Sequence, residues 1–354
     1  METKFLSSAI GSMPFKDADY AVGVSLKLLD APIWPQLPAF GLREQMEIQY
    51  SEGIPCAVID DEKGRMFFQT DGDYSEAFAA FYEQYMSAAD PDEGTGDFGF
   101  AAISDAYSKG IGTLFKALEA EGKKRPWLKV QTTGPCSFAL TIVDENKRAI
   151  YYNEEFRDVI VKALAAKCRW QIQKFKPFAE NIICFIDEPI LSAFGSSTYV
   201  SVNRDDVVAL LSEVVEAVHA EGALAGVHCC GNTEWSILID AGVDIVNFDA
   251  FSYGETIAIY ADAVKAHLER GGILAWGVVP TSAAIREQTA DTLAAQLEKV
   301  IDNLAAKGID KGLITRQAIV TPSCGTGSLD AADAEKVFAL LSAVSQTMKT
   351  KYHF

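Results

Sequence analysis

Short apolar runs alternate along the chain with segments in which apolar residues recur every three or four positions. Each run ends in polar or glycine residues, as a buried β-strand does where it enters a loop. Segment 205–220 is typical of the intervening helices, because its apolar residues form one stripe, with Asn203 as a candidate N-cap and Gly222 as a candidate stop. The predicted strands are residues 8–12, 33–37, 128–132, 182–186, 223–227, 243–248, 273–279 and 318–320.

This alternation predicts parallel strands that are joined by crossover helices. Eight strands is the number in a (β/α)8 TIM barrel, and we expect residues 1–354 to form a single α/β domain of that class. An open doubly wound sheet is the alternative, but no G-x-G-x-x-G motif follows a predicted strand. Two regions fit the alternation poorly. Residues 54–70 predict a hairpin inserted after the second strand, and residues 87–99 predict an exposed acidic loop.

Net charge, apolar run length and cysteine count each bear on which partners and which cellular location the chain suits. The formal net charge is −18 and lysine and arginine do not cluster, which disfavours nucleic acid as a partner. No run approaches the roughly 18 apolar residues of a membrane span, and the first residues lack the features of a signal peptide. The seven cysteines are odd in number and scattered, unlike a disulfide framework. We therefore expect a soluble cytoplasmic protein without a membrane partner, and its oligomeric state stays open.

Reactive side chains follow several of the predicted strands. In a TIM barrel the chemistry takes place at the carboxyl ends of the strands, where each strand enters its βα loop. We therefore expect these side chains to share one rim of the barrel. The residues concerned are Ser12, Asp187, Glu188, His228, Cys230, Asp249 and Cys324.

The stretch GVHCCGNTEW, residues 226–235, carries metal-binding residue types. His228 and Cys230 lie two positions apart, so an extended backbone points both the same way and Cys229 the opposite way. Histidine and cysteine are zinc ligands, and a catalytic zinc site uses three protein ligands. Cys324 follows the last predicted strand and is the candidate third ligand. In the simpler interpretation the cysteines are core residues and the acidic residues at strand ends are loop caps.

Six segments carry a further signal through their order and spacing: AIGSMPF, TTGPCSF, FIDEPIL, VHCCGNTEW, VDIVNFDAF and VTPSCGTG. Together they span most of the chain and resemble the catalytic C-terminal domain of cobalamin-independent methionine synthase. The surrounding superfamily includes uroporphyrinogen decarboxylase and zinc methyltransferases that use methylcobalamin. The resemblance implies a Zn²⁺ site with ligands His228, Cys230 and Cys324, and it places Asp249 where methionine synthase has a glutamate ligand.

The resemblance also implies roles in substrate binding. Ser12 matches the segment that contacts the homocysteine carboxylate, and Asp187 matches an acid near the homocysteine amino group. We take Asp187 and Asp249 as candidate catalytic residues, and Ser12, Asp187 and Glu188 as candidate substrate-binding residues. A small-molecule thiol is the expected substrate.

Other segments depart from the family. The tryptophan segment near the folate is replaced by GPCSFALTIVDENK, and a D-I-H-S segment by VVPTSA at residues 278–283. These departures favour a methylcorrinoid over a methylfolate as the donor, either as free methylcobalamin or on a corrinoid protein. The resemblance thus implies methyl transfer to a thiol, most directly homocysteine to give methionine. The alternatives are transfer to coenzyme M or another thiol, a uroporphyrinogen decarboxylase-like reaction, and a non-catalytic barrel that binds zinc or a corrinoid.

Overall fold

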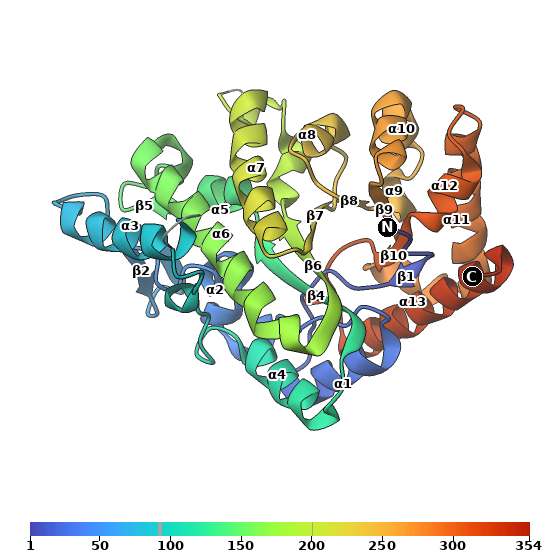
Figure 1. Ribbon diagram of the computed structural model, residues 1–354, viewed down its shortest axis with the longest axis horizontal. Coiled ribbons are helices and arrows are strands. Elements are labelled where there is room, and N and C mark those ends of the chain that lie inside the picture. Colours follow the sequence, from blue (N-terminus) through green and yellow to red (C-terminus); the bar gives the residue numbers. More distant parts are fainter. Residues whose placement is uncertain (91–93, 200) are drawn as a thin grey trace.

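The computed structural model describes residues 1–90, 94–199 and 201–354, and in these residues parallel strands alternate with helices (Figure 1). None of the helices in these ranges is long and apolar enough to cross a membrane. Only part of the predicted acidic loop can be compared, because residues 91–93 lie outside the described residues and residues 87–89 end helix α3. The helices are α1 (Ala18–Leu28), α2 (Met46–Gln49), α3 (Ser75–Ala89), α4 (Lys109–Glu121), α5 (Pro135–Thr141), α6 (Glu154–Phe175), α7 (Arg204–Ala220), α8 (Trp235–Asp240), α9 (Ala250–Tyr253), α10 (Ala261–Glu269), α11 (Ala290–Ala305), α12 (Lys311–Arg316) and α13 (Ala331–Tyr352).

A curled parallel sheet of seven strands forms the centre of the fold within the described ranges. The order of neighbours runs from β10 back to β6 without a reversal, which differs from a doubly wound sheet. The crossover helices lie on the outer side of the sheet (Figure 1). In spatial order the strands are β1 (Leu6–Ser7), β10 (Ala318–Pro322), β9 (Ile273–Val279), β8 (Ile245–Phe248), β7 (Leu224–Cys229), β6 (Ala179–Asp187) and β4 (Arg125–Thr133).

The prediction of a closed barrel of eight strands is wrong for the described residues, because their central sheet has seven strands and stays open. Residues 33–37 are not a strand and make only two isolated parallel bridges, from Ile33 to Lys129 and from Gln36 to Ser12. The hydrogen-bonded sheet in the described residues therefore ends at β1 and β4 and does not close. Proline explains the difference, because Pro32, Pro35 and Pro38 lack the N–H groups that a continuous ladder needs.

The residues of the predicted hairpin lie in a separate small sheet. Strands β2 (Ala57–Asp60) and β3 (Arg65–Phe68) pair antiparallel, and β5 (Val143–Asp144) adds to β3 in parallel. Its placement after a second barrel strand stays a prediction, since residues 33–37 are not such a strand, and so does the single-domain assignment.

Helix α7 begins and ends where its sequence predicts. The side chain of Asn203 accepts a hydrogen bond from the N–H of Asp206, as an N-cap does. Gly222 adopts a left-handed φ of 75°, a conformation that glycine reaches without steric cost, and the chain turns there towards β7. The apolar stripe of the helix, including Val207, Leu211 and Val214, is fully buried against the sheet.

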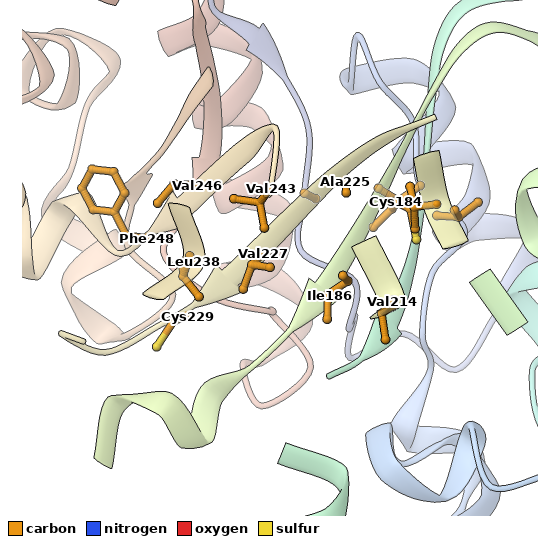
Figure 2. Packing of buried hydrophobic residues seen from close by; sticks show 14 of the residues in the cluster. Cys184, Ile186, Val214, Ala225, Val227, Cys229, Leu238, Val243, Val246 and Phe248 are labelled. Carbon is orange, nitrogen blue, oxygen red and sulfur yellow. The ribbon is translucent and has the colours of Figure 1, made fainter. Parts of the chain in front are cut away.

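The two faces of the sheet bury separate apolar groups. We call the smaller group the inner cluster: its members come from five strands and two connecting segments yet contact one another, as the concave side of a curled sheet allows. On the outer face, Cys184, Val227 and Cys229 pack with residues of α7 and α8 such as Val214 and Leu238 (Figure 2). The inner cluster consists of Leu6, Ile10, Ala31, Ile183, Phe185, Ile245, Ile273, Ala275 and Ile319.

Candidate metal centre

A row of polar residues lies at the carboxyl ends of four neighbouring strands. Thr133 of β4 is paired with Asp187 of β6, Asp187 with His228 of β7, and His228 with Asn247 of β8. Asp187 and Asn247 lie two positions beyond Phe185 and Ile245 of the inner cluster, so alternation along the strand turns them to the same concave side. The apolar inner cluster thus forms the floor beneath a polar layer.

His228, Cys230 and Cys324 come together at this layer. One ligand atom from each of the three lies within 4.8 Å of the other two. The ligands of a tetrahedral zinc ion lie about 3 to 4 Å from one another, given bond lengths of about 2.0 to 2.3 Å, so the spacing suits a metal of that size. Cys229 lies on the outer face, where its Sγ contacts the carbonyl oxygen of Gly231. The group could hold a metal ion, and it includes His228 and Cys230 but not Cys229. The role of these residues as ligands stays a prediction.

The ring of His228 is buried and held from one side. Its Nδ1 is hydrogen-bonded to Oδ1 of Asn247, while its Nε2 is buried and has no hydrogen-bond partner among the described residues. A buried nitrogen without a partner is costly unless a ligand satisfies it. The chemistry of this atom, next to two sulfurs, fits a metal ligand.

The two thiols lie close enough to shift each other's pKa. The contact with the Cys324 thiol lowers the pKa of Cys230 to about 4. The same contact, together with burial, raises the pKa of Cys324 above its usual range. Of the two, Cys230 is the thiol whose surroundings favour the thiolate. A divalent cation favours the deprotonated form of both thiols, so metal binding would release protons.

Asp187 is a buried carboxyl group beside this cluster. Its Oδ1 has no hydrogen-bond partner within the described ranges, and the same is true of Oγ1 of Thr133 on the neighbouring strand. Burial raises the pKa of Asp187, and the side chains of His228 and Lys129 act against that rise. Unsatisfied polar atoms on two neighbouring strands form a place for a hydrogen-bond donor. No feature of the sequence marks Thr133 beyond its position at a strand end.

Lys129 is a buried cation in the floor of the site. Its Nζ donates to the carbonyl oxygen of Ile10 at 2.6 Å and to Oε1 of Gln131 at 3.1 Å, and lies 4.6 Å from the centre of the Phe185 ring. Burial lowers its pKa to about 8, and the charge of Asp187 opposes this. Lys129 therefore places positive charge beneath the carboxylate of Asp187.

Glu188 lies on the outer face and holds a helix. Its carboxylate accepts hydrogen bonds from the N–H of Cys136 at 2.9 Å, and from the N–H and hydroxyl of Ser137, both at 2.7 Å, at the start of α5. Burial raises the pKa of Glu188 to about 7 in spite of these donors. This arrangement matches the simpler interpretation of a polar cap, and the predicted contact between Glu188 and a substrate stays a prediction.

Asp249 and Ser12, the two remaining predicted site residues, each have a hydrogen-bond partner within the protein. Asp249 is the N-cap of α9 and accepts from the N–H of Ser252 at 2.8 Å, so this carboxylate already has a partner, and it is not a member of the ligand group. The Oγ of Ser12 accepts from the N–H of Gly327 at 3.2 Å, which places it against the loop that carries Cys324. Metal ligation by Asp249 and substrate binding by Ser12 both stay predictions.

Comparisons with known proteins place the fold. No family model matches the chain, and no curated protein matches it. A methyltransferase from Methanosarcina mazei matches in structure with a TM-score of 0.59 at 14% identity, over 97% of this chain and 94% of that one. A D-psicose 3-epimerase matches 70% of this chain and 84% of its own with a TM-score of 0.33 at 13% identity, which is too distant to support an argument. The first likeness shows a shared TIM-barrel-like fold.

Proposed function

We propose that this protein is a zinc-dependent methyltransferase that moves a methyl group from a methylcorrinoid to a thiol, most directly homocysteine to give methionine. The observation that carries the proposal is the convergence of His228, Cys230 and Cys324, whose nitrogen and two sulfurs are a donor set that zinc prefers. Three protein ligands leave a fourth position open, as catalytic zinc sites do. The fold shared with a methyltransferase supports methyl transfer as the reaction class.

The residues of the site suit an acceptor thiol that carries an amino group. Zinc, when bound, would supply the Lewis acid that keeps an incoming thiol deprotonated at neutral pH. The unpartnered Oδ1 of Asp187 and Oγ1 of Thr133 would accept hydrogen bonds from an ammonium group. A thiol bearing an acidic group in place of the amine, as in coenzyme M, would meet the carboxylate of Asp187 and is expected to be the poorer acceptor.

The direct test is a methyl-transfer assay with the purified protein. Methylcobalamin and methyltetrahydrofolate are each combined with homocysteine and with coenzyme M, and methylated product is measured together with zinc content. We expect product from methylcobalamin and homocysteine. Product with the folate alone would reject the corrinoid donor, and zinc-loaded protein that yields no product would support a non-catalytic role.

The ligand assignment is tested by three serine variants. Cys230→Ser and Cys324→Ser should lose most of the bound zinc, because serine is a poor zinc ligand and only two of the three donors remain. Cys229→Ser is the matched control, because Cys229 directly precedes Cys230 and its side chain lies on the outer face of β7. Zinc content by elemental analysis is the measurement. Stoichiometric zinc in either ligand variant would contradict the site.

A further inference from the structure

We propose that Asn247 is a positioning residue that fixes the tautomer and ring orientation of His228 and thereby sets how tightly the cluster holds a metal ion. The identity of the metal rests on the proposed function, whereas the hydrogen bonds of Asn247 do not. Asn247 is fully buried on β8, and its register partner on β7 is His228. It contacts a candidate ligand without belonging to the ligand group.

The orientation of the Asn247 amide is determined by its other two contacts. Its Nδ2 donates to the carbonyl oxygen of Ala275 at 2.9 Å and to Oγ1 of Thr321 at 2.8 Å. A backbone carbonyl oxygen only accepts, so the NH₂ end of the amide has to face Ala275. The carbonyl end, Oδ1, then faces His228.

This orientation decides which nitrogen of His228 carries the proton. Oδ1 of Asn247 only accepts, so the contact with Nδ1 is a hydrogen bond that Nδ1–H donates. The neutral ring then has its lone pair on Nε2, the nitrogen that is buried and unpartnered in the described part of the chain. A histidine that binds a metal through Nε2 needs this tautomer.

The whole chain of contacts joins four strands. It runs from His228 on β7 through Asn247 on β8 to Ala275 on β9 and Thr321 on β10. Thr321 lies three residues before Cys324, at a register shift between β9 and β10. The network therefore links β7, which carries His228, to β10, which precedes Cys324. It holds the imidazole in a fixed orientation without a bound metal.

The test measures metal affinity in the intact protein for Asn247→Leu, Asn247→Asp and Thr321→Val. Zinc affinity comes from competition with a chelating dye, and the coordination of cobalt(II), used as a probe, from its visible spectrum. We expect Asn247→Leu, which is similar in shape but accepts no hydrogen bond, to bind zinc about 10- to 100-fold more weakly. Thr321→Val leaves the bond to Ala275, so its loss should be smaller.

Asn247→Asp separates positioning from packing. It keeps an acceptor for Nδ1–H but buries a carboxylate against the Ala275 carbonyl, so it should melt at a lower temperature than Asn247→Leu and yet bind zinc more tightly. If affinity instead follows melting temperature, with the aspartate variant the weakest binder, the inference is overturned.

The remaining outcomes are also distinct. Equal zinc affinity in Asn247→Leu and the unsubstituted protein would overturn the inference and leave the proposed function standing. Unsubstituted protein that binds neither zinc nor cobalt would contradict the proposed function itself. Should Asn247→Leu fail to fold, Thr321→Val decides the question, because unchanged zinc affinity after loss of this bond would overturn the proposed link from Thr321 through the amide to His228.

Discussion

At the scale of single residues, the direction in which a side chain leaves a strand decides what it does. Asp187 and Glu188 are adjacent acids at the end of β6, and both are almost completely buried. Asp187 faces the concave side and keeps one oxygen without a partner in the described residues, while Glu188 faces outward and is held by the first N–H groups of α5. One oxygen of Asp187 therefore remains available to a ligand, whereas the carboxylate of Glu188 is engaged by α5.

The charge of Asp187 is the part of the site that we expect to select the acceptor. Asp187→Asn keeps the shape but removes the negative charge, so the hydrogen bond to an ammonium group loses its charge assistance. A charged hydrogen bond is worth about 1.5 to 3 kcal/mol, so KM for homocysteine should rise about 10- to 100-fold. Steady-state kinetics give KM and kcat, and zinc content should not change.

The control for this variant is a thiol that lacks the amine. With 4-mercaptobutanoate, which has the homocysteine skeleton without its amino group, the unsubstituted protein and Asp187→Asn should perform alike. A loss of the same size with both thiols would mean that Asp187 acts on the metal site or on the fold and does not recognise the amine.

Part of the candidate site can be predicted from the sequence of single strands. Alternation along a strand is enough to separate Cys230 from Cys229, and the structure places them on opposite sides. The parts played by Asn247 and Thr133 depend on which residue lies opposite on the next strand, Asn247 facing His228 and Thr133 facing Asp187. Such register is a tertiary property, and a single strand does not encode it.

At the scale of elements, helix α6 is anchored by a buried lysine. Nζ of Lys167 donates to the carbonyl oxygens of Glu52 at 2.6 Å and of Ala101 at 3.4 Å, so the helix holds two connecting segments. Burial lowers the pKa of Lys167 to about 8, with Glu52 acting in the opposite direction. The lysine therefore binds its proton less strongly in the folded protein than in the unfolded chain.

This difference predicts a pH dependence of stability. Between pH 8 and 10.5 the unfolded chain keeps the Lys167 proton that the folded protein has lost, so the unfolding free energy should rise with pH in that window. The contribution reaches at most about 3 kcal/mol, since each pKa unit is worth about 1.36 kcal/mol. Denaturant unfolding at several pH values, compared between the unsubstituted protein and Lys167→Met, measures it.

Lys116→Met on α4 replaces an exposed lysine and is the control. Its pH profile should follow that of the unsubstituted protein. Parallel profiles for Lys167→Met and the unsubstituted protein across pH 8 to 10.5 would show that the proton of Lys167 is not linked to folding.

Element boundaries show where apolar pattern fails as a guide. The pattern of apolar and polar residues correctly predicted β4, β6 to β10 and α7, because burial and periodicity agree in these elements. It failed for residues 8–12, because β1 covers only Leu6–Ser7 and Ser12 makes an isolated bridge. It also failed for residues 33–37, since an apolar run indicates burial and does not show whether the backbone has N–H groups to share. The three prolines in residues 32–38 were the available signal.

At the scale of the whole molecule, the site depends on the pairing of β1 with β10. Leu6 and Ser7 are register partners of Ile319 and Val320, and beyond them Ser12 meets the loop that carries Cys324. The hydroxyl of Thr326 donates to the carbonyl oxygen of Ser12 at 2.9 Å. The segment after β1 and the loop after β10 are therefore held together by hydrogen bonds.

Gly325→Ala tests this close approach. A Cβ at Gly325 would lie 2.1 Å from Oγ of Ser12, so the hydroxyl must turn away and lose its bond from the N–H of Gly327. We expect a loss of about 1 kcal/mol of unfolding free energy, the usual worth of such a bond. Ser12→Ala should lose a similar amount, and the double variant should lose no more than either one. Additive losses in denaturant unfolding would contradict the contact.

The same pairing sets an order of events during synthesis. Thr3 Oγ1 donates to the carbonyl oxygen of Ala318 across 315 positions of the chain, so the ribosome makes β1 long before its neighbour. At about 5 to 20 residues per second, this delay is on the order of tens of seconds. During this delay β1 lacks its partner strand β10, and its N–H and C=O groups could pair with another nascent chain. Because β1 has only two residues, few such groups are exposed to that pairing.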